Sequence, residues 1–139
     1  VLPYKFESGT LNTPGIAGLL AGLRVVKART LEAIRKHESE LANDCLRQLK
    51  AIDGIDVYGN ADVGVIAFSI TGVDSHEIAM ILDQHYQIAV RAGLHCAPLT
   101  HEQLETIDTG LIRVSFGFMN TKEEVDTFIQ AMKEIKQYY

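Results

Sequence analysis

Apolar residues recur along this chain with two different periods, one typical of helices and one typical of strands. Two segments show the three-to-four-residue spacing of amphipathic helices, residues 31–52 and 121–135, and Asp74 or Ser75 is expected to cap a further helix that runs to about Tyr86. Thr121 to Glu124 forms a capping box that opens the helix over residues 121–135. A fourth helix is predicted after Thr13-Pro14, because a hydroxyl residue followed by proline is typical of a helix start.

Short apolar runs between these helices predict strands. The expected strands are Ile55–Tyr58, Val63–Ile70, Gln87–Arg91 and Leu111–Phe116. Residues 92–109 are expected to be mostly loop. Helices and strands in this order predict an α+β fold, with a small, mostly antiparallel sheet and helices packed on one face.

Length and composition set limits on what the chain can be. A chain of 139 residues suits one domain, and its formal charge of −5 argues against a nucleic-acid-binding surface. The apolar stretch Leu11–Leu23 is too short to span a membrane. With two cysteines and no secretory signal, we expect reduced thiols in the cytoplasm. Residues 1–12 are interpreted as an extended arm and 13–139 as the folded domain.

The segment Ala89–Pro98 is the chemically most informative part of the chain. It leads from a short apolar strand into a glycine-containing loop that carries Arg91, His95 and Cys96. Cationic neighbours favour the thiolate, which is the nucleophilic form of cysteine. An unpaired cysteine is also often a small buried hydrophobe, and Cys45 suits that interpretation because it lies on the apolar face of a helix.

Other interpretations of the same residues remain open. His95, Cys96 and His101 could supply three ligands of a zinc site, although no carboxylate stands at ligand spacing. Arg91 and Arg113 each interrupt an apolar strand, so they serve either a structural ion pair or a fork that binds a carboxylate. Three further histidines lie on polar helix faces and are expected to be solvated: His37, His76 and His85.

Several segments, in the same order, resemble the cysteine desulfurases and selenocysteine lyases, pyridoxal-phosphate enzymes of the class V aminotransferase family. The segments that carry the resemblance are Phe6–Asn12, Val63–Phe68, Ile88–Cys96, Gly110–Ser115 and Asn120–Asp126. The resemblance covers essentially the entire chain and implies the C-terminal domain of a fold-type I enzyme. Leu94 departs from members that carry a second histidine there.

The resemblance implies roles for individual residues. Cys96 matches the nucleophile that takes sulfur or selenium from the substrate and becomes a persulfide. Arg113 matches the arginine that holds the substrate carboxylate, Arg91 an arginine at the entrance of the site, and His95 a histidine beside the nucleophile that contributes to substrate binding. Metal ligands are not implied.

The resemblance also implies partners for this chain. Gly9 and Thr10 match an arm that reaches the phosphate of the pyridoxal phosphate in a partner subunit, which implies a homodimer. The lysine that binds this cofactor belongs to a preceding large domain, and no lysine here has its Ser-x-His-Lys context. We therefore expect no cofactor bound covalently to this chain, an inactive isolated chain, and a sulfur-acceptor protein as a further partner.

Two alternatives to a desulfurase or selenocysteine lyase follow from the same residues. One is another class V enzyme, such as a sulfinate desulfinase, in which Cys96 matters less. The other is a non-enzymatic sulfur-carrier or interaction module without a catalytic half.

Overall fold

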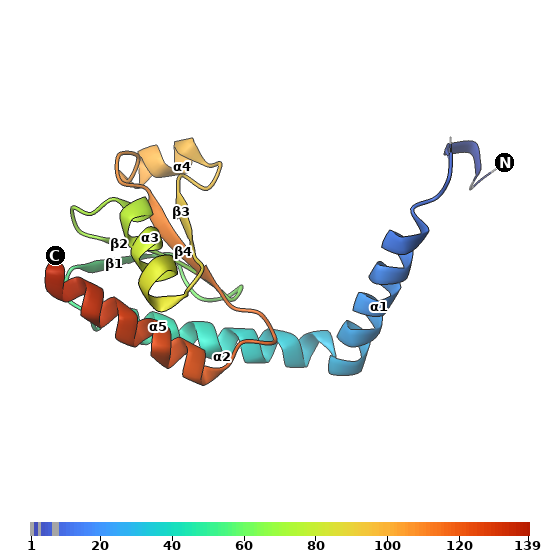
Figure 1. The fold of residues 1–139 in the computed structure, drawn as a ribbon, viewed down its shortest axis with the longest axis horizontal. Helices are drawn as coiled ribbons and strands as arrows, with labels where there is room; N and C mark the ends of the chain where they lie inside the picture. Colours follow the sequence, from blue (N-terminus) through green and yellow to red (C-terminus); the bar gives the residue numbers. More distant parts are fainter. Residues whose placement is uncertain (1, 3, 7–8) are drawn as a thin grey trace. The chain divides into compact units, whose positions relative to one another are not determined.

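The structure, a computed structural model, describes residues 2, 4–6 and 9–139 (Figure 1). The chain divides into two compact units, Val1–Ile34 and Arg35–Tyr139. Four residues of the predicted arm lie outside the described residues: Val1, Pro3, Glu7 and Ser8. No helix in the described ranges is both long enough and apolar enough to cross a membrane.

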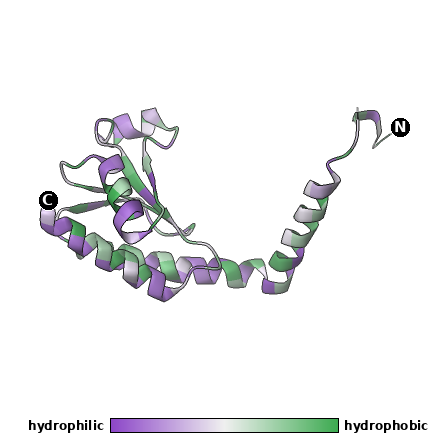
Figure 2. Ribbon diagram, in the orientation of Figure 1, coloured by the Kyte–Doolittle hydropathy of each residue, from purple (hydrophilic) through white to green (hydrophobic). Residues whose placement is uncertain are grey.

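The first unit contains a short 3-10 helix, η1 (Tyr4–Phe6), and helix α1 (Thr13–Arg29). The side chain of Asn12, not the predicted Thr13, caps α1 by accepting a hydrogen bond of 3.1 Å from the backbone N–H of Gly15. The correction agrees with the preferences of helix N-caps, in which Asn is favoured over Thr. Part of α1 is coloured as hydrophobic in Figure 2, and four of its apolar residues have exposed side chains: Ile16, Leu19, Leu20 and Leu23.

The second unit is built on a four-stranded sheet. Its strands are β1 (Ile55–Tyr58), β2 (Val65–Ile70), β3 (Arg91–Gly93) and β4 (Leu111–Ser115). They lie in the order β1-β2-β4-β3, and each neighbouring pair is antiparallel. The predicted antiparallel sheet is therefore confirmed.

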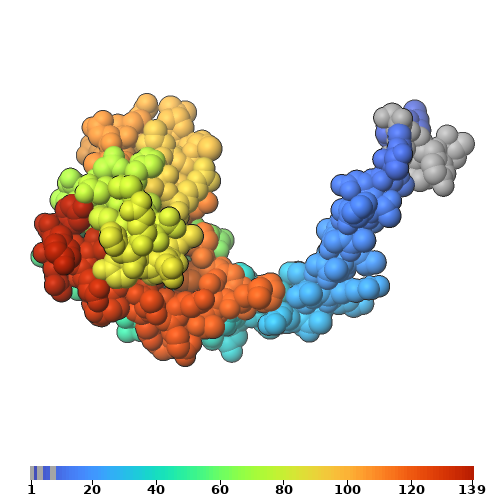
Figure 3. All heavy atoms as spheres, viewed as in Figure 1, coloured from blue at the N-terminus to red at the C-terminus, as the bar shows by residue number. Residues whose placement is uncertain are grey.

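Helices cover one face of this sheet. They are the second half of α2 (Leu31–Leu49), α3 (Ser75–Tyr86) and α5 (Lys122–Ile135) (Figure 1). Alternate residues of the central strands enter one apolar core with these helices: Ile66, Phe68, Ile70, Ile112 and Val114. The phenyl ring of Phe68 meets that of Phe128 edge to face at 6.0 Å. In the space-filling view α3 and α5 lie against each other (Figure 3).

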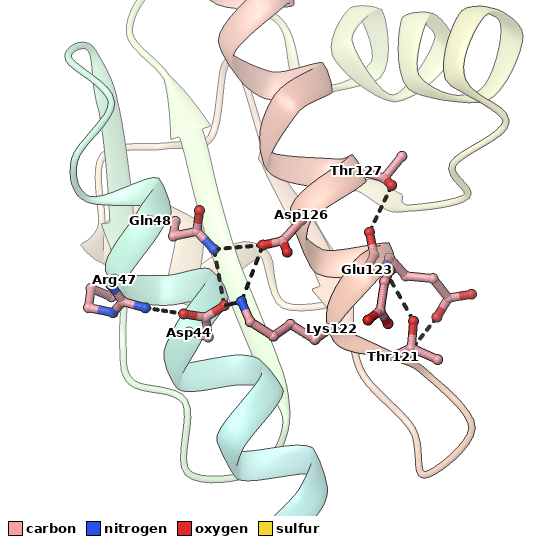
Figure 4. A network of polar contacts seen from close by, with 9 residues as sticks. Asp44, Arg47, Gln48, Thr121, Lys122, Glu123, Asp126 and Thr127 are labelled. Atoms are coloured by element: carbon pink, nitrogen blue, oxygen red, sulfur yellow. Dashed lines mark hydrogen bonds and ion pairs between the residues drawn. The ribbon is translucent and has the colours of Figure 1, made fainter.

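Polar contacts stabilise the start of α5 and also join this helix to α2. Thr121 and Glu124 form the predicted capping box, each side chain accepting from the other residue's backbone N–H. The Asp44 carboxylate of α2 lies 3.5 Å from the Lys122 ammonium of α5, and Lys122 also reaches Asp126 at the same distance (Figure 4). An ion pair thus joins the two helices at the edge of the core.

The structure differs from two local predictions, fully for one strand and in part for one loop. The third strand covers Arg91–Gly93 rather than 87–91, because Gln87 takes a left-handed conformation (φ 57°) that ends α3, and residues 88–90 form no ladder. The predicted loop 92–109 contains β3 residues and a helix of its own, α4 (Pro98–Gln103), with Pro98 at its first position. Proline suits that position because its fixed φ is already helical.

Candidate active site

Cys96 lies in a tight turn between β3 and α4. The backbone N–H of Ala97 donates a hydrogen bond of 2.8 Å to the carbonyl of Leu94, which closes the turn around His95 and Cys96. Both central residues have positive φ, 53° and 60°. Such angles are uncommon for residues other than glycine, and they concentrate at functional sites where the surroundings hold the strain in place. The turn leaves the Cys96 side chain exposed.

Two arginines stand beside this turn. Arg91 of β3 pairs with Arg113 of β4 in the antiparallel ladder. Because Ala92 and Ile112 form the next pair and Ile112 faces the core, Arg91 and Arg113 project from the face of the sheet opposite this core. The Nη2 group of Arg91 donates to Cys96 Sγ at 3.5 Å. A positive charge at this distance stabilises a thiolate.

The charges of these arginines are not neutralised within the described part of the chain. No carboxylate there lies within ion-pair distance of Arg91 or Arg113. Arg113 Nε is buried, and no described residue forms a hydrogen bond with it. The structural ion pair that the sequence left open is therefore not formed among these residues. The two guanidinium groups remain available to a carboxylate from outside.

His95 is held by β4. Its Nε2 lies 3.1 Å from the carbonyl oxygen of Leu111, and because a carbonyl only accepts, Nε2 carries the hydrogen. The other ring nitrogen, Nδ1, is buried and has no hydrogen-bond partner among the residues that the structure describes. Burial lowers the pKa of His95, and the charges of Arg113 and Arg91 lower it further, against an opposing effect of the hydrogen bond to Leu111. Both effects favour the neutral imidazole, and in the tautomer that donates from Nε2 the Nδ1 atom carries a lone pair.

A buried contact beside His95, between His101 and Thr106, was not predicted from the sequence. The ring of His101 lies 5.9 Å from that of His95, tilted by 42°, and its Nδ1 is 2.9 Å from Thr106 Oγ1. Both His101 and Thr106 are buried. No periodicity predicts this contact, since α4 and the following turn bring the two residues together.

The described residues contain no group of three side chains that could hold a metal ion, so the structure gives the zinc interpretation no support. Two of the three proposed ligands use a ring nitrogen for a hydrogen bond within the chain. His95 uses Nε2 for the Leu111 carbonyl, and His101 uses Nδ1 for Thr106.

Close backbone contacts hold β3 in register with β4. Ser75 Oγ accepts a hydrogen bond of 3.2 Å from the N–H of Gly93. Gly110 has φ +65°, and a Cβ there would lie 2.7 Å from Ser75 Oγ and 2.8 Å from Gly93 Cα. A glycine is therefore required where β4 begins. Ser75, considered from the sequence as a possible helix cap, supports the site instead, and Asp74 caps α3.

The remaining candidates lie elsewhere. Cys45 is buried in the core, and burial, with a contribution from Asp44, raises the pKa of its thiol to about 12. Gly9 and Thr10 belong to the first unit and are exposed. His76 and His85 are exposed as expected, whereas His37 is half-buried and donates from Nε2 to the carbonyl of Asn120 at 2.8 Å.

The lysines do not form a cofactor anchor at this site. All of them lie in the described part of the chain, and none is buried. Two lysines of the second unit form ion pairs with residues outside the turn: Lys122 with Asp44 and Asp126, and Lys36 with Glu40. A cofactor held as a lysine Schiff base does not fit these residues alone.

Sequence comparison relates the chain to a known family. The model of the aminotransferase class-V family matches residues 1–128. A probable cysteine desulfurase of Halalkalibacterium halodurans is 39% identical over 99% of this chain and 34% of its own length. A probable cysteine desulfurase of Staphylococcus aureus is 38% identical over 99% of this chain and 33% of its own. The chain thus spans about a third of the length of these curated relatives.

Solved structures share the fold. The apo cysteine desulfurase of Thermococcus onnurineus NA1 superposes with a TM-score of 0.89 at 35% identity, covering 99% of this chain and 34% of that protein. The Escherichia coli cysteine desulfurase CsdA, in an S-sulfonic acid form, gives a TM-score of 0.88 at 30% identity over 98% of this chain and 33% of its own.

Proposed function

Because this chain belongs to the aminotransferase class-V family, we propose that it forms the C-terminal part of a cysteine desulfurase or selenocysteine lyase. The longer protein removes sulfur or selenium from cysteine or selenocysteine, releases alanine and keeps the sulfur as a persulfide on Cys96. One observation carries this proposal. An exposed thiol lies 3.5 Å from the Arg91 guanidinium, and Arg113 stands opposite Arg91 on the neighbouring strand.

The arginines bind the carboxylate of the amino-acid substrate. Arg113 has a planar fork of N–H donors that matches a carboxylate through two parallel hydrogen bonds. Its charge is not satisfied by a carboxylate of the described residues. Arg91, at the outer end of β3, adds a second positive charge at the entrance of the site. An anionic substrate therefore relieves the repulsion between the two guanidinium groups.

Cys96 then takes the sulfur. The Sγ thiolate attacks the sulfur of the substrate, so that an S–S bond forms and the substrate's C–S bond breaks. The electron pair of the C–S bond stays on carbon, which gains a proton, and the product is alanine. Arg91 stabilises the thiolate before attack. The strained turn at His95-Cys96 fixes the direction in which the thiol projects.

Pyridoxal phosphate, the cofactor implied for the family, supplies the electron sink for this chemistry. The lysines of this chain do not fit its anchor, so we assign the anchor to the remaining two thirds of the longer protein. Gly9 and Thr10 are proposed to contact its phosphate in a partner subunit, as part of a homodimer. A sulfur-acceptor protein removes the persulfide sulfur, and we propose the cytoplasm as the compartment, because both thiols must stay reduced.

The proposal is tested with the full-length protein and its cofactor. Alanine release and a Cys96 persulfide, detected by mass spectrometry, are expected from the unmodified protein and not from Cys96→Ala. Cys45→Ala is the matched control, because it removes the other thiol far from the turn. Undiminished alanine release by Cys96→Ala would exclude Cys96 as the nucleophile. Parallel rates with cysteine, selenocysteine and cysteine sulfinate assign the substrate and test for a sulfinate desulfinase.

A further inference from the structure

The turn that carries Cys96 holds two residues in unfavourable backbone conformations. His95 and Cys96 both have positive φ, and the hydrogen bond of 2.8 Å from the Ala97 N–H to the Leu94 carbonyl closes the turn around them. Such conformations cost about 1–3 kcal/mol each and persist only where the surrounding structure holds them. The residues that follow the turn supply this support in two steps.

The first step is the start of α4. The Ala97 carbonyl accepts hydrogen bonds from the N–H groups of Thr100 and His101, at 3.0 and 3.2 Å. The residue after Cys96 is thus tied to the backbone of His101. The His101 side chain is buried, and its ring lies 5.9 Å from the ring of His95. His101 therefore borders the turn twice, through its backbone after Cys96 and through its ring beside His95.

The second step joins α4 to β4. His101 Nδ1 lies 2.9 Å from Thr106 Oγ1, and the Thr106 N–H donates to the His101 carbonyl, also at 2.9 Å. The Thr106 carbonyl in turn accepts from the N–H of Gly110 at 2.9 Å. Gly110 directly precedes β4 and is packed so closely that an added Cβ would lie 2.8 Å from Gly93 Cα of β3. Hydrogen bonds therefore connect the turn, α4 and the start of β4 in one path.

We propose that His101 and Thr106 are positioning residues for Cys96: their side-chain hydrogen bond locks α4 to the segment before β4 and so holds the strained turn in place. The turn then presents the thiol at 3.5 Å from the Arg91 guanidinium. A buried hydrogen bond suits this task, because a partner left unpaired in the interior would be costly. The role rests on the proposed function, which makes Cys96 the nucleophile, and it requires neither residue to touch substrate.

Two variants of Thr106 in the full-length protein separate the hydrogen bond from packing. Thr106→Val keeps the size of the buried side chain and removes the hydroxyl, whereas Thr106→Ser keeps the hydroxyl and removes a methyl group. We expect kcat for alanine release from cysteine to fall about five- to tenfold in Thr106→Val and to stay within about twofold in Thr106→Ser. KM should change little, because Arg113 still holds the carboxylate. Thr127→Val, which removes an exposed hydroxyl bonded to the Glu123 carbonyl of α5, is the control.

His101→Phe tests the pair from its other side. It keeps an aromatic ring beside His95 and removes the nitrogen that meets Thr106. We expect the same fall in kcat, and no further fall when Thr106→Val is added, because residues that act through one contact do not have additive effects. An unchanged kcat in His101→Phe, or independent losses that multiply in the double variant, would overturn the proposal. Equal kcat values in Thr106→Val and Thr106→Ser would overturn it as well.

Hydrogen exchange gives a direct measurement that needs no turnover. In the 139-residue chain, exchange of the Ala97 amide, followed by NMR, reports on the hydrogen bond that closes the turn. We expect this amide to exchange about five- to tenfold faster in Thr106→Val than in the unmodified chain or in Thr106→Ser. The Phe116 amide, which donates to the Gly64 carbonyl beyond the far end of β4, is the internal control for a loss of overall stability.

Equal acceleration at Ala97 and Phe116, or none at Ala97, would show that the pair does not hold the turn and would overturn the inference. The same measurement keeps this inference separate from the proposed function. If the full-length protein released no alanine from cysteine, the proposed function would fail, while exchange at Ala97 would still show whether His101 and Thr106 hold the turn.

Discussion

Arg91 lies directly opposite Arg113 across the β3–β4 ladder, so two like charges begin from neighbouring positions on one face of the sheet. Like charges in this arrangement destabilise a sheet unless something neutralises them. No carboxylate of the described residues does so. The arrangement is explained if an anion binds between or above the two guanidinium groups, and the first two predictions follow from that.

Replacing Arg113 by lysine should impair substrate binding although the charge is kept. Lysine cannot form the two parallel hydrogen bonds that the guanidinium fork gives to a carboxylate. We expect Arg113→Lys in the full-length protein to weaken binding by about 1.5–3 kcal/mol, and Arg113→Ala to weaken it at least as much. Steady-state kinetics with cysteine measure the effect. Arg35→Lys, an exposed change on α2, is the control, and equal kinetics for Arg113→Lys and Arg35→Lys would contradict a carboxylate fork.

Removing one charge of the arginine pair should stabilise the chain while impairing activity. Arg91→Gln relieves the repulsion across the ladder, so we expect the free energy of unfolding to rise by about 0.2–1 kcal/mol at low salt. The gain should shrink at high salt, because exposed charges are screened. Urea unfolding of the 139-residue chain at two salt concentrations tests this. A loss of stability at low salt would show that Arg91 has a favourable partner instead.

The two thiols should differ in reactivity. Cys96 is exposed in its turn, whereas Cys45 is buried and its pKa is raised to about 12. Because the thiolate is the reactive form, iodoacetamide at neutral pH should alkylate Cys96 in the folded chain and both cysteines in the unfolded chain. Mass spectrometry of peptides after brief treatment measures this. Comparable labelling of Cys45 without denaturant would mean that the core opens readily around α2.

Sequence patterns predicted the elements that depend on local periodicity. The apolar stripe of α5 and the capping box at Thr121 are local signals and formed as expected, whereas the stripe of α2 is buried only from Leu41 to Leu49 and Leu31 is exposed. The strand β3 was misplaced because its start depends on the left-handed Gln87, which is not a glycine and gave no signal. Local patterns therefore sufficed where neighbours in sequence decide the structure.

The site was partly predictable for a different reason. Arg91, Cys96 and Arg113 were chosen for their chemistry and their resemblance to a family, and the ladder brings the two arginines together. The contact of His95 with Leu111 and that of His101 with Thr106 depend on how β4 and α4 pack. Tertiary contacts of this kind leave no period in the sequence, so the sequence alone did not predict them.

Gly110→Ala should disrupt the start of β4 more than a substitution at another glycine of similar conformation. A Cβ at residue 110 would lie 2.7 Å from Ser75 Oγ, whereas Gly72, with φ +76°, has nothing within 4 Å of the added atom. Gly72→Ala should cost about 1–2 kcal/mol of stability for its backbone conformation. Gly110→Ala should cost about 1–3 kcal/mol more, because packed atoms must move. Equal urea midpoints for the two variants would refute this close contact.

The Asp44 ion pair should make the stability of the second unit depend on acid pH. Burial opposes ionisation of Asp44, but Lys122, Gln48 and Arg47 outweigh it and hold the pKa of this carboxyl below its usual value (Figure 4). A carboxyl with a lowered folded-state pKa stabilises the fold above its unfolded pKa of about 3.9. That stabilisation is lost as the pH falls through the folded-state pKa of Asp44, because the carboxyl is then protonated in the folded state as well.

Asp44→Asn keeps the shape of the side chain and removes its charge, so it isolates this effect. We expect the variant to be less stable than the original chain by about 0.5–1 kcal/mol at pH 7, since the pair is only partly shielded from water. The difference should close as pH falls below about 4, because the original chain then loses the same charge. Thermal or urea unfolding from pH 7 to pH 2 measures it, with Asp53→Asn in an exposed turn as the control. A difference that stays constant down to pH 2 would assign the loss to packing or hydrogen bonding rather than to the ion pair between α2 and α5.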